Sequence, residues 1–558
     1  MAEEVWAPEG YPSMDLHPPR RMHKMPLTVG ASVAVGSTWA PLRRGVFRAL
    51  WLAVLVSNVG LWMETVGAQW LLVSQPNAAV LVALVQTADM LPDLMFGLVG
   101  GILADTFDRR WLLIVVNAAM AITAGALTLL TVTGQMPPAL LLIFTFLVGS
   151  GSVVTLPAYQ ALIPDLVPRA ELHAASALGS VSINLARAVG PAVAGLLIAR
   201  VGVAAVFGLN ALSYVFFLAV VLVWRPGTSG AKEFPEQFGS ALRAGSRYVR
   251  HSPVVRRILL RAALFLVPGS ALWALLPLIA SQRLQQGAGG YGLLLGALGT
   301  GAVAGAFILP RLQAKMTSNA MIGAAGLAYA AVLVAAVLPR NLPLTLAALL
   351  LGGVSWMAVL SHINAELQLF LPEWVRARGL SIYQMVLFGS QALGALAWGF
   401  VAAPLGLVPT FLVAAFLMLA AVGTLRFWPL IDTANIDTRV AAYWPEPQLV
   451  FDARPHTGPV VISNVYTVSA DREADFLAAM SQVRKSRLRT GATRWGLFRD
   501  GETAHQFVEL FVVASWEEHL RQHTDRLTGF DRESEEKAAA LSDPPERSSH
   551  LLSVEVDD

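Results

Sequence analysis

The sequence contains no cysteine and few charged residues. Without cysteine among its 558 residues, the chain has no disulfide, no thiolate metal site and no cysteine nucleophile. Charged residues make up 14% of the chain, whereas ordinary soluble domains carry about a quarter. Apolar residues reach 55%, and the mean hydropathy is +0.58. This composition excludes a large soluble enzyme.

Long apolar runs fill the middle of the chain, between Phe47 and Phe427. Each run of roughly 20 residues can cross a hydrocarbon core of about 30 Å. Apolar patterning and breaker residues predict about twelve transmembrane helices. They begin near residues 47, 78, 110, 138, 173, 203, 254, 289, 318, 343, 379 and 407. We therefore predict an all-α membrane protein with a small additional domain at its C-terminal end.

Arginine and lysine are distributed unevenly between the loops. Most lie in the even-numbered loops, above all after the sixth span, whereas the odd-numbered loops hold only Arg200, Arg283 and Arg340. Because basic loops stay on the cytoplasmic side, both termini are predicted to be cytoplasmic. The formal net charge of +3 reflects these loops and predicts no nucleic-acid partner.

Composition divides the chain into six segments. We predict a cytoplasmic tail at 1–45, a six-helix bundle at 46–225, a basic cytoplasmic loop at 226–253, a second six-helix bundle at 254–430, a linker at 431–458 and a cytoplasmic α+β domain at 459–558. Four glycines recur at an offset of 204 residues: Gly97, Gly101, Gly190 and Gly195 return as Gly301, Gly305, Gly394 and Gly399. Two pseudo-symmetric bundles are the plan of a transporter that rocks around a central site.

The loop after the second predicted span carries a recognisable string, Gly101-Ile102-Leu103-Ala104-Asp105-Thr106-Phe107-Asp108-Arg109-Arg110. It resembles motif A of the major facilitator superfamily, with Asp108 in place of the second glycine. The resemblance implies a conformational gate of Gly101, Asp105, Arg109 and Arg110. A carboxylate can accept hydrogen bonds from the N-terminus of a neighbouring helix, and the resemblance puts that partner near Leu380 and Ser381. Ordinary juxtamembrane charges are the alternative.

The fifth predicted span carries a second string, Ala186-Arg187-Ala188-Val189-Gly190-Pro191-Ala192-Val193-Ala194-Gly195, and Asn184 lies two residues before it. It resembles motif C of exporting members, in which Asn184, Arg187, Gly190, Pro191 and Gly195 belong to a bent, tightly packed antiporter helix. A simple packing kink is the alternative. With segments 164–169, 207–213 and 244–253, the chain resembles the enterobactin-exporter-like branch, the transmembrane secretion effectors. That resemblance covers about residues 45–430 and implies a bacterial inner-membrane exporter of a siderophore, secondary metabolite or drug.

Ionisable residues inside a bilayer are costly and usually functional. Glu64, Asp89 and Asp93 fall inside the first two predicted spans, and Arg187 inside the fifth. A desolvated carboxylate can take up a proton in one state and release it in another. We therefore predict proton antiport, with Asp89 as the first candidate for the coupling group. Glu64 is either a proton carrier or the partner of Arg187 in a buried ion pair.

The first span also carries a polar stripe that predicts a wall of the substrate cavity. Its members are Asn58, Trp62, Thr65 and Gln69. Trp62, together with Trp273 and Trp356, is a candidate contact for a lipophilic substrate, and interfacial anchoring is the alternative.

The C-terminal segment predicts a compact α+β unit. Its pattern gives a strand at 460–468, a helix at 471–490, a hairpin of 493–498 and 506–513, a helix from Trp516 and a last strand near 551–556. This order resembles the ferredoxin-like, dimeric α/β-barrel domains related to antibiotic-biosynthesis monooxygenases. The resemblance implies a homodimer through this domain.

Two features of this domain raise the question of chemistry. His519 and His523 have a spacing that can bind metal, but a solvated helix face is the simpler interpretation, so we predict no metal, no cofactor and no catalysis. A basic cluster, formed by Arg484, Lys485, Arg487 and Arg489, is expected to face water or anionic lipid headgroups. The alternative function is a membrane-anchored enzyme or sensor whose C-terminal domain is the active part.

Overall fold

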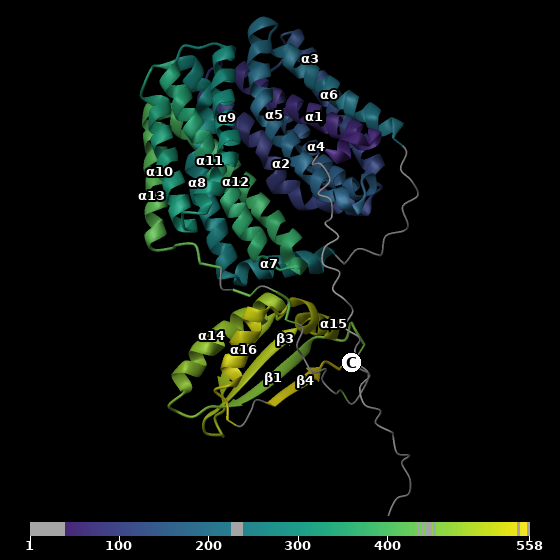
Figure 1. Cartoon of the computed structure of the whole chain (residues 1–558), viewed down its shortest axis with the longest axis vertical. Helices are drawn as coiled ribbons and strands as arrows, with labels where there is room; N and C mark the ends of the chain where they lie inside the picture. Colours follow the sequence, from purple (N-terminus) through teal and green to yellow (C-terminus); the bar gives the residue numbers. More distant parts are fainter. Residues whose placement is uncertain are drawn as a thin grey trace, which may run out of the picture.

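The computed structural model describes residues 39–224 and 238–554, except 434–435, 438, 442–448, 450–453 and 544–546. Within these residues, twelve helices are long and apolar enough to cross a membrane. They form two bundles that stand side by side, with a small α+β domain beneath them (Figure 1). The predicted fold class is confirmed.

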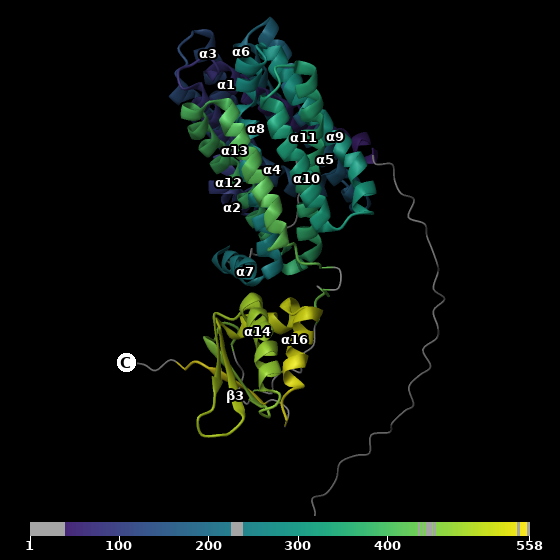
Figure 2. The same ribbon diagram turned by 90° about the vertical axis from the view of Figure 1, so that its left-hand side faces the viewer.

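The first bundle consists of α1 (Gly45–Leu72), α2 (Ala78–Thr106), α3 (Arg109–Val132), α4 (Pro138–Leu166), α5 (Leu172–Arg200) and α6 (Val203–Val223). The second consists of α8 (Pro253–Leu278), α9 (Ala288–Gln313), α10 (Ser318–Val337), α11 (Leu342–Phe370), α12 (Glu373–Leu405) and α13 (Leu407–Gly423). Between them in the chain, α7 (Phe238–His251) lies between the bundles and the C-terminal domain in both views (Figure 2). Eleven of the twelve spans begin within about two residues of the predicted starts, because prolines and polar residues mark their ends.

The eleventh span, α12, begins at Glu373 rather than near residue 379. Pro372 precedes its first turn, and the carboxylate of Glu373 favours the positive end of the helix dipole. Arg376 and Arg378 therefore lie in the helix and not in a loop. Residues 380 and 381 lie within the helix, where backbone N–H groups bond to the preceding turn. The prediction that they form an exposed helix start is wrong.

The two bundles repeat the same packing. In the first, α2 packs on α4, α3 on α6 and α1 on α5; in the second, α9 packs on α11, α10 on α13 and α8 on α12. The bundles meet along two seams, α2 with α12 and α5 with α9. Because α9 and α12 are the repeats of α2 and α5, the two seams are the same contact related by pseudo-symmetry.

Two repeated glycines occupy equivalent places in these seams. A Cβ atom on Gly195 of α5 would lie 2.8 Å from the Ala288 carbonyl oxygen and from the Gly292 Cα of α9. A Cβ atom on Gly399 of α12 would lie 3.0 Å from the Ala79 carbonyl oxygen of α2. Both seams therefore bring helix backbones together at a distance that glycine permits and larger residues obstruct.

The other glycine pair of the same repeat packs inside each bundle. A Cβ atom on Gly190 would lie 2.7 Å from the Trp62 Cβ of α1, and one on Gly394 would lie 2.9 Å from the Val267 carbonyl oxygen of α8. Pro191 follows Gly190 within α5. Hence Gly190 and Gly394 hold α5 and α12 against the first helix of their own bundle.

The seams are not closed along their whole length. We call the side facing α7 and the C-terminal domain the tail side, and the opposite side the far side. Gly195 and Gly399 lie near the far-side ends of their helices. Towards the tail side, a Cβ atom on Gly389 of α12 would lie 3.0 Å from Leu94 of α2. Around this contact, α2, α7 and α12 line a cavity of about 570 Å³. The seam contacts of Gly195 and Gly399 thus lie at the far side, and a cavity beside the α2–α12 seam lies towards the tail side.

The C-terminal domain contains β1 (Val460–Thr467), α14 (Glu473–Thr490), β2 (Arg494–Arg499), β3 (Gln506–Val513), α15 (Trp516–Arg521), α16 (Gly529–Ala539) and β4 (Arg547–Leu552). Its antiparallel sheet has the order β2-β3-β1-β4, which confirms the predicted α+β unit. The apolar stripe of α14 contributes Phe476, Met480 and Val483 to the core. The last strand begins at Arg547, earlier than predicted, because it pairs with β1 from Val465 onwards.

The far-side seam predicts the effect of enlarging Gly195. We expect Gly195→Val to force α5 away from α9 and to open the far side, since overpacking costs about 1–3 kcal/mol. Maleimide labelling of a single cysteine at the other seam, Ala83→Cys, should become about tenfold faster. The cysteine-free chain makes this label specific. Gly179→Val on the same helix, where a Cβ atom meets nothing within 4 Å, is the control. Equal labelling rates in Gly195→Val and Gly179→Val would contradict the conclusion that Gly195 holds the far-side seam closed.

Candidate transport pathway

Glu64 of α1 is buried and turns towards α6 rather than α5. Its carboxylate accepts a hydrogen bond from Asn210 Nδ2, and Asn210 also donates to the Tyr214 hydroxyl at 3.4 Å. In the described part of the chain, no ion pair joins Glu64 to Arg187, and Glu64 Oε1 has no hydrogen-bond partner. The alternative of a buried Glu64–Arg187 pair is therefore not realised in this state.

Asp89 and Asp93 lie on α2, on either side of Pro92. Both are partly buried, and the charge of Asp89 acts on Asp93 and on Glu64 of the neighbouring α1. Packing of α4 fixes α2 at this point, because a Cβ atom on Gly149 would lie 3.0 Å from the Asp89 carbonyl oxygen. Asp89 is thus the carboxylate that interacts electrostatically with both of the others in the first bundle.

The structure brings together three tryptophans that are far apart in the sequence. The ring of Trp62 on α1 lies 6.2 Å from that of Trp273 on α8, which lies 5.4 Å from that of Trp356 on α11. The guanidinium of Arg187 on α5 lies 5.7 Å from the centre of the Trp62 ring. Among the described residues, Arg187 forms neither a hydrogen bond nor an ion pair. A cation and an aromatic cluster therefore meet between the two bundles.

The polar residues of the α1 stripe have different partners, some within the first bundle and some in the second. Asn58 Nδ2 donates to Ser182 Oγ of α5 at 3.5 Å, and Thr65 Oγ1 donates to its own helix at Leu61. Gln69 Nε2 donates to Gln86 Oε1 at 3.4 Å, and Gln69 also accepts a hydrogen bond from the Tyr291 hydroxyl of α9. Of the four residues predicted to line a cavity, Trp62 joins the aromatic cluster and Gln69 links the bundles towards the far side.

The motif A arginines hold the tail-side ends of neighbouring helices. Arg109 Nη1 donates to the Ala161 carbonyl at 2.6 Å and lies 3.3 Å from Asp165 Oδ2. Arg110 donates to carbonyl oxygens at the end of α6, those of residues 221 and 222, at 3.1 and 2.8 Å. A Cβ atom on Gly101 would meet nothing within 4 Å. The side chain of Asp105 lies outside the described residues.

Asp108, the departure from motif A, is the N-cap of α3. Its Oδ1 accepts a hydrogen bond from the Trp111 amide at 2.9 Å, and its φ of −58° needs no glycine. An N-cap aspartate contributes about 1 kcal/mol. The sequence signal for it was present, since an Asp directly precedes a predicted helix start.

The basic cluster of the C-terminal domain splits into two pairs. Arg487 is buried and lies 3.4 Å from Glu509 and 2.8 Å from Glu535, while the buried Arg489 pairs with Asp531. The prediction that these two arginines face water or lipid is wrong. Arg484 is exposed and Lys485 is partly exposed, as predicted.

A polar network at Glu509 lies inside the C-terminal domain and was not predicted. Glu509 on β3 is fully buried and accepts hydrogen bonds from Asn464 at 2.8 Å, Tyr466 at 3.2 Å and Trp495 at 2.7 Å. Four partners, counting Arg487, satisfy a charge that would otherwise be costly to bury. A glutamate in the middle of an apolar strand is the sequence signal that points to such a network.

His519 and His523 are buried, so the prediction of a solvated helix face is wrong. The His519 ring centre lies 4.9 Å from that of His523 and 5.0 Å from that of His550. Burial, together with the neighbouring imidazoles and Arg487, lowers the pKa of His519 to about 3 and that of His523 to about 2. Among the described residues, no three His, Asp or Glu side chains are arranged to hold a metal ion.

Two bundles of repeated packing, joined along two seams around a charged and aromatic centre, define a major facilitator-type transporter. The family model described as transmembrane secretion effector matches residues 36–557, so the chain belongs to that family. The match includes the C-terminal domain as well as the membrane helices.

Curated relatives resemble the chain over most of the membrane part. The staphyloferrin A transporter of Staphylococcus aureus is 24% identical, over 63% of this chain and 88% of its own. The multidrug efflux pump Tap of Mycobacterium tuberculosis is 26% identical, over 72% and 98%. The enterobactin exporter EntS of Shigella boydii is 30% identical, over 48% and 63%.

Solved structures confirm the fold. A single-residue variant of the nucleoside transporter NupG has a TM-score of 0.58 at 10% identity, and the match covers 69% of this chain and 99% of its own. A bacterial homologue of the lysosomal transporter Spinster has a TM-score of 0.54 at 16% identity, over 70% and 96%.

The buried histidines predict that acid destabilises the C-terminal domain. Their folded pKa values lie below the unfolded value of about 6.5, so unfolding takes up protons, and stability present above pH 6.5 is lost as pH falls towards 3. Each histidine should remove up to about 1.4 kcal/mol per pH unit. Pulse proteolysis of the full chain in urea at pH 4–7 measures this loss.

The double variant His519→Asn, His523→Gln should show a shallower pH dependence, because its side chains do not titrate. His456→Gln, at a site 90% exposed, is the control and should keep the parental slope. A parental slope in the double variant would show that other groups cause the acid sensitivity.

Proposed function

We propose that the chain exports a small lipophilic compound, a siderophore, secondary metabolite or drug, across the bacterial inner membrane by alternating access. The names of its relatives, which include siderophore and multidrug exporters, support this substrate range. The arginine distribution supports cytoplasmic termini and so makes the tail side the cytoplasmic side. We infer that the described conformation is open towards the cytoplasm and closed towards the outside, since the seam glycines Gly195 and Gly399 lie at the far side and a cavity lies towards the tail side.

The two seams supply the moving parts of this cycle. The far-side contacts of Gly195 and Gly399 hold the cytoplasm-open state, and they must part when the bundles rock. In the opposite state, the motif A segment with Gly101, Asp105, Arg109 and Arg110 would approach α12 and close the tail side. The open space beside Gly101 supports this role, because nothing obstructs the approach of a helix there.

Proton influx is the proposed source of energy. Asp89 interacts with Asp93 and with Glu64, so adding a proton to Asp89 changes the affinity of the other two carboxylates for protons. Asp89 is the carboxylate whose charge acts on both of the others. We therefore keep it as the first candidate for the coupling group.

Replacing Asp89 should uncouple transport from the proton gradient. Cells that make Asp89→Asn should retain the same small molecules as cells without the transporter, because the side chain can no longer exchange a proton. A protonophore should produce the same retention in cells with the parental chain and add nothing in the variant. Mass spectrometry of cell extracts measures retention, with Glu373→Gln as the carboxylate control. Continued protonophore sensitivity in Asp89→Asn would exclude Asp89 as the coupling group.

Arg187 is the observation that carries the choice of substrate class. A partly buried cation without a carboxylate partner is costly inside a membrane span, so it points to a negatively charged group that binds there during the cycle. The three tryptophans provide an apolar, polarisable wall beside it. We propose that the preferred substrate is acidic and carries an apolar or aromatic part, which favours a siderophore or acidic metabolite over a cationic drug.

Substitution of Arg187 tests this preference. Under iron limitation and with a panel of acidic and cationic drugs, cells that make Arg187→Gln should retain acidic compounds about tenfold more than parental cells, since one charge-assisted contact is worth about 1.5–3 kcal/mol. Arg187→Lys should restore part of the export. Equal retention of cationic and acidic compounds would contradict an acidic substrate and leave Arg187 with a structural role.

The C-terminal domain is proposed to regulate or pair the transporter rather than to catalyse a reaction. It contacts α7 and the second bundle: Arg247 lies 3.4 Å from Glu518, and the Arg526 guanidinium lies 5.0 Å from the centre of the Trp374 ring. A homodimer through this domain, proposed from the resemblance of its fold, would join two transporters through their tails.

A further inference from the structure

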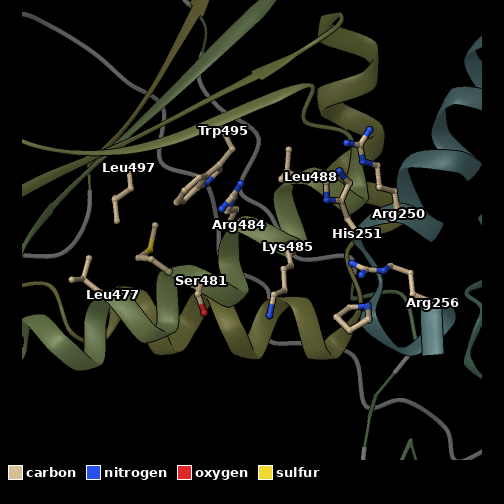
Figure 3. A pocket seen from close by; sticks show the side chains of 12 residues that line it. Arg250, His251, Arg256, Leu477, Ser481, Arg484, Lys485, Leu488, Trp495 and Leu497 are labelled. Atoms are coloured by element: carbon tan, nitrogen blue, oxygen red, sulfur yellow. The ribbon is translucent and has the colours of Figure 1, made fainter. Parts of the chain in front are cut away.

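A cavity of about 480 Å³ lies between α7, the start of α8 and the C-terminal domain. Arg250 and His251 border it from α7 and Arg256 from α8, while Arg484 and Lys485 border it from α14 (Figure 3). Side chains from two separate parts of the chain therefore form its walls.

The charged residues that line this cavity are all basic. The lining contains no Asp or Glu side chain. Within the described part of the chain, the three arginines and Lys485 form no ion pair, although the Arg484 guanidinium lies 5.7 Å from the centre of the Trp495 ring. Like charges that face one another across a gap repel and weaken the contact between α7 and α14.

A separate observation supports a concentrated positive field. The pKa of His251 is lowered, first by burial and then by Arg250, Arg484, Arg247 and Arg256. The positive charges of arginines on α7, α8 and α14 therefore all reach the side chain of His251. An anion placed there would relieve the repulsion from both sides.

The cavity also has an apolar part. Leu477, Met480 and Leu488 of α14 and Trp495 and Leu497 of β2 line it beside the basic groups (Figure 3). A small inorganic ion would leave these side chains in contact with water. A phosphate that carries glycerol or another organic group would cover them, and about 480 Å³ is within the range of ordinary ligand sites.

We propose that this cavity binds an organic phosphate anion, and that the bound phosphate joins the C-terminal domain to α7. The phosphate oxygens accept hydrogen bonds from Arg250 and Arg256 on one side and from Arg484 and Lys485 on the other. Two sources offer this chemistry: the headgroup of an anionic phospholipid, since α7 lies just outside the membrane helices, and a soluble phosphate ester.

Binding to the full chain tests the proposal. Native mass spectrometry would follow titrations with dioctanoyl phosphatidylglycerol, dioctanoyl phosphatidylcholine and glycerol phosphate. The phosphatidylglycerol should bind at least tenfold more tightly than the phosphatidylcholine. The double variants Arg484→Gln, Lys485→Gln and Arg250→Gln, Arg256→Gln should each weaken its binding about thirtyfold, because each basic residue near an anionic headgroup contributes about one factor of five.

A matched variant separates this site from general charge effects. The double variant Arg532→Gln, Lys537→Gln removes the same charge from exposed positions on α16 and should bind like the parental chain. The charge-preserving variant Arg484→Lys should also retain binding, and its thermal unfolding confirms folding. Glycerol phosphate that binds more tightly than the lipid identifies a soluble source, and tighter binding of the lipid identifies a headgroup. Equal binding of both lipids, or an equal loss in the α16 variant, would overturn the proposal.

Discussion

Backbone contact between the two bundles is the constraint on which the rest of the structure depends. In a membrane, no hydrophobic force drives one helix onto another, so close packing of small residues supplies the attraction. Gly195 and Gly292 allow α5 and α9 to touch, and Gly399 does the same for α12 against α2. Because the two seams are equivalent by the internal repeat, a rocking motion strains both together, which favours a two-state opening over independent movements.

Between the seams, most polar side chains have hydrogen-bond partners within the fold, whereas Arg187 has none among the described residues. Asn58, Thr65 and Gln69 all have hydrogen-bond partners, so their burial is compensated within the fold. Among the described residues, Arg187 has only the face of Trp62 as a partner, and a cation–π contact contributes about 0.5–2 kcal/mol, depending on how far the site is desolvated. The contacts among the described residues therefore do not account for an arginine at this place, and the proposed anionic substrate would supply the missing partner.

Sequence patterns predicted the positions of helices and strands well, but they predicted the contacts between these elements poorly. Helix starts followed from prolines and polar loops, and the eleventh failed because Arg376 and Arg378 look like loop residues although they occupy the first turns of α12. The repeated glycines predicted two pseudo-symmetric bundles, but the sequence does not show that Gly195 and Gly399 face the opposite bundle, which the structure does. Burial of His519 and Arg487 could not be predicted, because it depends on β4 and α16, which arrive from distant parts of the chain.

The attachment of the C-terminal domain determines what its basic cavity can influence. Its described contacts reach α7 through Arg247 and α12 through Trp374. The domain is therefore attached to the second bundle through α12, and α7 belongs to the segment that connects the two bundles. A negative charge that bridges α7 and α14 stabilises one arrangement of that connector, and an empty cavity leaves its cations in mutual repulsion. Occupancy of the cavity and the position of α7 against the C-terminal domain are thus linked, because each changes the free energy of the other.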